Sequence, residues 1–285
     1  MKLLLSATGS PLRVRAACRR HNKIILLLSN TEKVNLIMAQ IQKTRCTAVT
    51  DSIVRLMLFC FCTNSFIPIT IQTMTLNLYL LRHGETTFSQ SGNFCGETDA
   101  DLTPAGMEMA SSFADVYQKL HWSAVYVSPM KRALGTAKPF CDATGMEMQV
   151  REGLREGSYG QWETKSKSFA QENYAENYVK WLTEPAWNAP IGGETAVEIA
   201  NRSMPVIAEI QEKHPQGNVL VVSHKATIRI MLCSLLGIDL GRYRYRVNIL
   251  VASVSMVKFD VNGPLLEILG DRHHLPDHIR SRPGT

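Results

Sequence analysis

The sequence has few cysteines, and they are not arranged as disulfide pairs or metal ligands. Four of the seven lie in residues 1–73, and Cys95, Cys141 and Cys233 are scattered singly through the rest. There is no C-x-x-C motif and no Cys/His pair at ligand spacing, so neither a disulfide framework nor a zinc site is indicated. This pattern favours a reducing compartment. We therefore expect residues 74–285 to be cytoplasmic and to bind no metal.

Acidic residues are scarce in the first 73 positions. Ten lysines and arginines stand there against only Glu32 and Asp51, whereas the remaining 212 residues carry 21 basic and 23 acidic side chains. The formal net charge of +6 therefore originates in residues 1–73. The nearly neutral remainder argues against a basic nucleic-acid surface and favours small-molecule partners.

Long apolar runs are also missing. Residues 56–75 carry no charge, but polar residues at 63–65 and Pro68 interrupt them, which argues against a membrane-spanning helix. Met1 is not followed by the apolar stretch of a signal peptide. We expect residues 1–73 to be a poorly structured basic extension. An Arg-rich organellar targeting segment and a true start at Met74 are the two alternatives for this region.

From residue 76 onward, apolar runs typical of strands alternate with amphipathic patterns typical of helices. Residues 76–81 and 218–222 are almost continuously apolar, as expected of strands covered on both faces. A third strand is expected at 124–127, and two more at 252–269 around the turn signal Asn262-Gly263. This alternation is typical of βαβ units, so we predict one α/β domain over residues 74–285 with a mostly parallel sheet.

Two pairs of residues predict where helices begin. Thr103 before Pro104 is typical of an N-cap followed by proline at the first helical position, and Ser128-Pro129 predicts the next helix in the same way. A further helix is expected over 194–214, with Pro205 kinking it or dividing it in two. The helix after Thr103 is expected to bury one face, formed by Met109, Phe113, Val116, Tyr117 and Leu120.

Basic and imidazole side chains stand where three expected strands end. Arg82 and His83 follow the first strand, His224 follows the 218–222 strand, and Arg132 lies in the first turn of the helix after the 124–127 strand. The carboxyl ends of parallel strands form one edge of the sheet, where ligands bind in open α/β folds. Arginine suits a phosphate oxygen and histidine a nucleophile, so these residues predict an anion site at that edge.

A series of ordered motifs between about residues 76 and 275 resembles the histidine phosphatase superfamily, also called the phosphoglycerate mutase-like family. The resemblance implies a three-layer α/β/α sandwich around a mostly parallel central sheet, with the active site at the carboxyl edge and no metal or organic cofactor. The motifs are RHGET at 82–86, DADLTPAG at 99–106, SPMKRALGT at 128–136, LREGSYGQWE at 154–163, GGET at 192–195 and VSH at 222–224.

The resemblance also implies roles for five residues. His83 is the nucleophile, forming a phosphohistidine that water then hydrolyses. Arg82, Arg132 and His224 surround the phosphoryl oxygens and so act in both catalysis and substrate binding. Glu156 protonates the leaving oxygen and later takes a proton from the attacking water. A hydrogen bond from the other nitrogen of His83 to a backbone carbonyl is expected to fix its tautomer.

One position departs from the family pattern. Relatives commonly have asparagine where this chain has Ser89, so either Ser89 or nearby Asn93 is expected to supply that phosphate contact, and Thr98 is a further expected substrate contact. Glu163 is expected to be a solvated charge. The aromatic residues between 165 and 189 are expected to form either a pocket wall or packed core.

The sequence favours a phosphatase over a mutase. Mutases of this family typically have a histidine after the Glu-Arg of the acid motif and a long insertion before the Gly-Gly-Glu segment. Here Gly157 follows Glu156, and the interval to Gly193 is short. We predict a metal-independent phosphomonoesterase for a small phosphorylated metabolite, with no nucleic-acid or membrane partner for residues 74–285. The alternatives are a cofactor-dependent phosphoglycerate mutase-type phosphotransferase and a catalytically silent phosphate-binding regulatory protein. The sequence does not indicate the oligomeric state.

Overall fold

The computed structural model describes residues 75–282, so the expectations for residues 1–73 lie outside the described part. Its strands are β1 (Leu76–Arg82), β2 (Trp122–Val127), β3 (Met148–Val150), β4 (Gly217–Ser223), β5 (Val254–Asp260) and β6 (Gly263–Asp271). Its helices are α3 (Thr87–Ser91), α4 (Pro104–Tyr117), α5 (Lys131–Thr144), α6 (Lys167–Asn173), α7 (Ala175–Thr183), α8 (Ala196–Lys213), α9 (Lys225–Leu236), α10 (Tyr243–Arg246) and α11 (Asp277–Arg280), with short 3-10 turns η1 (Glu152–Leu154), η2 (Gly160–Trp162) and η3 (Leu240–Arg242).

The strands of this region form one sheet in the order β3-β2-β4-β1-β5-β6. β1 is parallel to β4, and β2 is parallel to both β4 and β3, whereas β5 and β6 are antiparallel to their neighbours. The two nearly continuous apolar segments expected to be covered strands are therefore the paired central strands β1 and β4. The predicted mostly parallel sheet and the hairpin after residue 252 are both confirmed.

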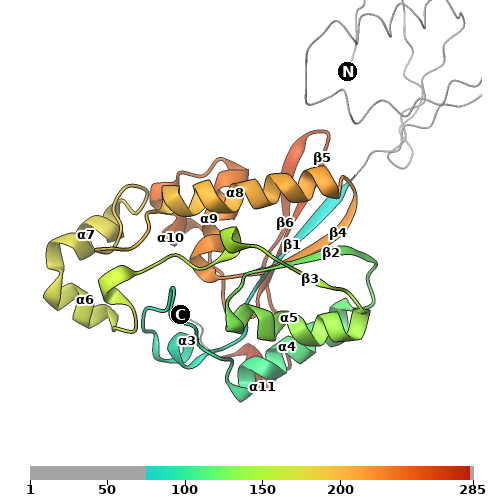
Figure 1. Ribbon diagram of the computed structural model, residues 1–285, viewed down its shortest axis with the longest axis horizontal. Coiled ribbons are helices and arrows are strands. Elements are labelled where there is room, and N and C mark those ends of the chain that lie inside the picture. The colour runs from blue at the N-terminus through green and yellow to red at the C-terminus, as the bar shows by residue number, and fades with distance from the viewer. Residues whose placement is uncertain (1–74, 283–285) are drawn as a thin grey trace, which may run out of the picture. The chain divides into compact units, whose positions relative to one another are not determined.

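Helices cover both faces of the sheet, as Figure 1 shows. α8 and α9 pack on the face that carries Leu78 and Leu80, while α4 and α5 pack on the face that carries Tyr79 and Leu81. Because side chains alternate across a strand, β1 supplies both apolar cores. The arrangement confirms the predicted α/β/α layering, and it leaves the carboxyl ends of β1, β2 and β4 at one edge of the sheet.

The start of α4 is as predicted, but its buried face is narrower. The Thr103 hydroxyl accepts a hydrogen bond from the Gly106 amide, and proline occupies the first helical position. Val116 and Leu120, which were expected to be buried, are 48% and 41% exposed. The helix ends at Tyr117, so Leu120 lies beyond its apolar stripe.

Two further helix predictions need correction. Ser128 does not cap α5, whose N-cap is Met130 without a side-chain hydrogen bond; the Ser128 hydroxyl instead bonds the His224 ring. Pro205 does not divide α8, which continues through it from residue 196 to 213. Pro205 lies on the exposed side of the helix, where the carbonyl that it leaves without a donor can be hydrated.

The aromatic residues near α6 and α7 form a small separate core. Phe94, Trp162, Tyr178 and Trp181 are buried against one another, whereas Trp187 is 72% exposed. Trp181 also lines the cavity at the sheet edge. Both expectations for this segment are therefore met in part, because it is mainly packed core with one side chain on the cavity wall.

Candidate active site

His83 lies where β1 ends and is held there by backbone contacts. Its amide donates to the Ser223 carbonyl at the end of β4, and its ring nitrogen Nδ1 lies 2.7 Å from the Gly84 carbonyl oxygen. A carbonyl only accepts, so Nδ1 carries the proton and Nε2 keeps its lone pair. Burial, followed by the charges of Arg132 and Arg82, holds the pKa of His83 well below its usual 6.5. The ring is therefore neutral at physiological pH.

Gly84 and Gly106 let two segments of backbone lie in direct contact beside His83. A Cβ at this position would lie 2.5 Å from the carbonyl oxygen of Gly106, and one at Gly106 would lie 2.1 Å from that of Glu85. The two glycines therefore allow the backbone after β1 to touch the start of α4. This backbone contact, together with a hydrogen bond from the Gly84 amide to Thr136, fixes the segment that carries His83.

His224 is the N-cap of α9 and lies beside His83, with ring centroids 5.1 Å apart. Arg132 donates from Nε to His224 Nδ1 at 3.2 Å, which leaves the proton on Nε2, 2.7 Å from the Ser128 hydroxyl. Burial, then the neighbouring cations Arg132 and Arg82, lowers the pKa of His224 well below 6.5. The second imidazole is therefore also neutral, and its tautomer is fixed.

Arg132 and Arg82 are two buried cations near His83. Arg132 is 0% exposed and donates to the carbonyls of Thr98 and Gly96, each at 2.8 Å. Arg82 donates to the Ile249 carbonyl at 2.9 Å. Burial lowers the pKa of Arg82 to about 9, against the opposing charge of Glu156, so it stays protonated near neutrality. Both guanidinium groups line the same cavity as His83.

Glu156 faces the cavity from the loop after η1. Its carboxylate accepts hydrogen bonds from the amides of Gly157, Ala226 and Thr227 at 3.0 to 3.2 Å. The last two belong to the first turn of α9, where free amides and the helix dipole favour an acidic group. His224 caps the same helix, so a single helix start positions both the imidazole and the carboxyl group.

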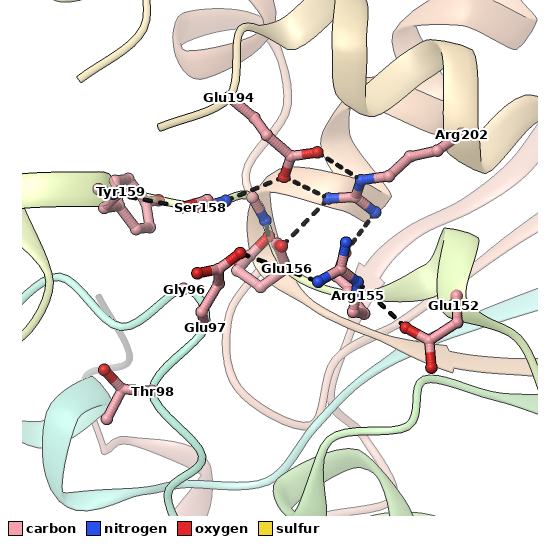
Figure 2. A network of polar contacts seen from close by, with 12 residues as sticks. Gly96, Glu97, Thr98, Glu152, Arg155, Glu156, Ser158, Tyr159, Glu194 and Arg202 are labelled. Carbon is pink, nitrogen blue, oxygen red and sulfur yellow. Dashed lines mark hydrogen bonds and ion pairs between the residues drawn. The ribbon is translucent and has the colours of Figure 1, made fainter. Parts of the chain in front are cut away.

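An ion pair between Arg202 and Glu194 holds the loop that carries Glu156, as Figure 2 shows. Arg202 of α8 forms a two-pronged ion pair with Glu194 at 2.8 and 2.9 Å, and it donates to the carbonyls of Gly153, Arg155 and Glu156. Glu194 in turn accepts from the Ser158 amide. The GGET and EGSYGQWE motifs therefore meet around one guanidinium group that fixes the backbone of Glu156.

Glu163 is not the solvated charge expected from the sequence. It is half-buried, and it accepts hydrogen bonds from the amides of residues 96–98 and Tyr159 and from the Thr98 hydroxyl. The loop of residues 96–98 that Glu163 binds carries the Gly96 and Thr98 carbonyls, which accept hydrogen bonds from Arg132. Glu163 therefore positions Arg132 through this loop, since the hydrogen bonds that its carboxylate makes go to the loop and to Tyr159.

The three minor contact predictions differ in where the structure places them. Ser89 and Asn93 line the cavity, although the Ser89 hydroxyl also bonds the Thr86 backbone and the Asn93 amide donates to Thr164. Thr98 is not among the lining residues, and its hydroxyl is directed at Glu163. Thr98 contributes its carbonyl to Arg132, so its side chain has no part in the cavity wall.

Four of the five main predicted residues line the cavity, whereas His224 lies behind the lining, with its ring 5.1 Å from that of His83 and bonded to Arg132. The structure adds further lining residues that sequence reasoning missed. Lys225 and Arg229 line the cavity from α9, Arg244 from α10, and Lys167 from α6. A sequence signal for two of them exists, because Lys225 and Arg229 lie one helical turn apart directly after His224. Nothing in the sequence indicates that Arg244 reaches the same space.

Most of the described domain matches a known family. The family model described as histidine phosphatase superfamily (branch 1) matches residues 78–272. The chain belongs to this superfamily. The resemblance predicted from the motifs is therefore confirmed, and with it the enzyme class: this histidine phosphatase is a phosphoric monoester hydrolase.

The aligned part of this chain spans most of the length of each of the following relatives. Phosphoserine phosphatase 1 of Hydrogenobacter thermophilus is 31% identical over 168 residues, which are 59% of this chain and 80% of that protein. Glucosyl-3-phosphoglycerate phosphatase of Mycolicibacterium vanbaalenii is 28% identical over 173 residues, covering 58% and 76%. The solved structure of Entamoeba histolytica phosphoserine phosphatase with 3-phosphoglyceric acid has a TM-score of 0.62 at 26% identity, covering 70% of this chain and 100% of that one.

Proposed function

We propose that this histidine phosphatase hydrolyses a small phosphomonoester through a phosphohistidine on His83, without a metal ion. In the first step Nε2 of His83 forms a bond to phosphorus while the bond from phosphorus to the alcohol oxygen breaks, and Glu156 gives that oxygen a proton. In the second step water attacks phosphorus, Glu156 takes a proton from the water, and the phosphorus–nitrogen bond breaks to release phosphate.

The observation that carries the proposal is the state of the His83 ring. An attacking imidazole must be neutral and must present a lone pair, and the contact from Nδ1 to the Gly84 carbonyl leaves that lone pair on Nε2. The same charges that lower its pKa, on Arg132 and Arg82, line the cavity where the phosphoryl oxygens would lie. A nucleophile held neutral beside two buried cations is suited to phosphoryl transfer.

Charge stabilisation in this proposal comes from the two guanidinium groups. They neutralise the phosphoryl oxygens in the transition state, as positioned cations do in phosphoryl-transfer enzymes. Among residues 75–282 no three His, Cys, Asp or Glu side chains gather in a way that could hold a metal ion. We assign the electrostatic role to Arg82 and Arg132 because both line the cavity with His83. His224 can donate to a phosphoryl oxygen once its ring nitrogen no longer bonds the Ser128 hydroxyl.

The substrate class follows from the relatives and the cavity. The named relatives act on phosphoserine and glucosyl-3-phosphoglycerate, both small phosphorylated acids. We propose that residues 74–285 are sufficient for activity on such a metabolite and that the enzyme is cytoplasmic, since Cys95, Cys141 and Cys233 are free thiols. No described helix combines the length and apolar character needed to cross a membrane.

Hydrolysis of p-nitrophenyl phosphate in excess chelator tests the mechanism. We expect full activity with chelator, complete loss in His83→Ala, and no loss in His121→Ala, which changes an exposed histidine outside the cavity. Rapid quenching should trap an acid-labile phosphoryl group, and Glu156→Gln should prolong its lifetime. Activity that survives in His83→Ala, or that chelator abolishes, contradicts the proposal. The chain beginning at Met74 should retain the same kcat.

A mutase reaction would give a different product from the same intermediate. When 3-phosphoglycerate is supplied with its bisphosphate, phosphorus NMR should show release of inorganic phosphate. Isomerisation faster than phosphate release would contradict the assignment as a phosphatase.

A further inference from the structure

The cavity beside His83 holds more positive charge than one phosphate group requires. Its lining residues include six cations, and Glu156 is the only carboxylate among them. Two of the six, Arg82 and Arg132, are assigned to the phosphoryl oxygens. The other four, Lys167, Lys225, Arg229 and Arg244, have no role in the proposed chemistry.

Two of these extra cations lie one turn apart on α9. Lys225 and Arg229 are four residues apart, so they lie on the same side of the helix, where like charges repel. The charges that act on Lys225 are those of Arg82, Arg229, Lys167 and the single acid Glu156. Burial and these cations lower the pKa of Lys225 to about 7. The arrangement destabilises the protein when no anion is bound, which indicates that an anion belongs there.

The arginines of this group are not fully hydrogen-bonded within the protein. The Nε atoms of Arg229 and Arg244 are buried and have no hydrogen-bond partner in the described part of the chain. Arg229 makes one long contact from Nη2 to the Asn248 amide oxygen at 3.5 Å. Arg244 is stacked on the Trp181 ring, with its guanidinium carbon 3.6 Å from the ring centroid. Stacking fixes the plane of this guanidinium group; part of its edge is bonded to the Tyr243 side chain, and the rest is placed for an oxyanion.

The positions of Lys225, Arg229 and Arg244 relative to Glu156 indicate that they would contact the alcohol part of a substrate. Glu156 meets the first turn of α9 and is assigned to the leaving oxygen, and Arg229 lies one turn further along that helix. We infer that the alcohol released by this enzyme carries a second oxyanion, a carboxylate or a phosphate, which Lys225, Arg229 and Arg244 bind. The inference rests on the proposed function, because it places the phosphoryl group on His83.

Matched substrate pairs test the inference. Phosphoserine and phosphoethanolamine differ by one carboxylate, whereas propanediol bisphosphate and propanediol monophosphate differ by one phosphate. We expect kcat/KM to be about 10- to 100-fold higher for the doubly anionic member of at least one pair, which is the usual effect of a hydrogen bond to a charged group. The pair with the larger ratio identifies whether the second group is a carboxylate or a phosphate.

Variants connect the preference to the residues. In Arg229→Met the ratio within the preferred pair should fall at least tenfold, and in Arg229→Lys, which keeps the charge, it should fall less. Lys138→Met, an exposed lysine of α5 outside the cavity, should leave the ratio unchanged. Arg229→Met should also melt at the same or a higher temperature than the wild type without ligand, because it removes a repelled charge. A residue with a purely structural role would lower it.

The outcomes separate this inference from the proposed function. If p-nitrophenyl phosphate is hydrolysed through His83 but both pairs give ratios near one, the second-anion site is wrong and the mechanism stands. Equal ratios in wild type and Arg229→Met also contradict the site. If His83→Ala remains active, the proposed function fails and the inference fails with it.

Discussion

Replacing Arg202 with methionine is expected to reduce both the stability of the domain and its kcat. The side chain is 17% exposed and makes five hydrogen bonds, two to Glu194 and three to backbone carbonyls around Glu156. Burial raises the pKa of Glu194, but its bonds to Arg202 and the Ser158 amide outweigh burial, and the net pKa is lowered. Methionine keeps much of the volume and removes every donor.

The expected loss of stability depends on the Glu194 carboxylate, which remains without its partner in Arg202→Met. Removing one partner of a buried ion pair costs about 3–5 kcal/mol, because the remaining charge stays desolvated. Glu194 keeps 23% of its side-chain surface exposed, so we expect the lower end, about 3 kcal/mol. In a domain of this size each kcal/mol shifts Tm by about 2–4 °C, which gives a loss of about 6–12 °C. A displaced Glu156 should lower kcat about 100-fold, as small misplacements of catalytic groups do.

Thermal denaturation and steady-state kinetics measure the two effects. Lys213→Met is the matched control, since Lys213 lies on the same helix in an exposed pair with Glu209 and should cost less than about 1 kcal/mol. Arg202→Lys should be intermediate, because an ammonium group cannot reproduce a planar guanidinium. A Tm within about 2 °C of wild type together with an unchanged kcat would refute the claim that this network positions Glu156.

Three further outcomes are expected. The Thr227 hydroxyl donates to the Arg155 carbonyl at 2.6 Å and lies 3.2 Å from Glu156 Oε1, so it can accept a hydrogen bond from the protonated carboxyl group of Glu156. Thr227→Val should therefore lower kcat about tenfold, and Thr227→Ser should restore it. Because the pKa of Lys225 is about 7, KM for a doubly anionic substrate should rise as pH increases through that value, and Lys225→Arg should remove the rise. Burial lowers the pKa of His274 to about 4, so the neutral ring is favoured in the folded state. The free energy of unfolding should therefore be highest above pH 6.5 and fall by about 3 kcal/mol as the pH is lowered to 4. Urea denaturation of the wild type and of His274→Phe measures this difference.

The central strands and the residues at their ends are legible in the sequence for a physical reason. Strands covered on both faces are almost continuously apolar, so 76–81 and 218–222 stand out, and the polar residues that follow them lie at one sheet edge. His83 and His224 were found in this way. The periodicity of α4 was less informative, because Val116 borders the helix face and solvent.

The supporting residues could not be found in this way, because their partners are distant in sequence. Arg282 pairs with Glu85 across 197 residues and gives no local signal. The carboxylate of Glu163 looks like a surface charge until the loop around Thr98 is folded against it. Motif membership indicated that these segments matter, but only the packed structure shows that Glu163 accepts from backbone amides and that Glu85 accepts from Thr103 and Arg282.

The two buried guanidinium groups act on His83 as well as on the phosphate of the substrate. Burial, followed by the charges of Arg132 and Arg82, lowers the pKa of His83, and the Gly84 carbonyl leaves the lone pair on Nε2. A bound phosphate dianion would raise that pKa again, but the same two cations offset its charge. The nucleophile therefore stays neutral in both states only if phosphate and guanidinium charges nearly cancel. Any second oxyanion must then be neutralised elsewhere, and Lys225 and Arg229, farther along α9, are placed to do so.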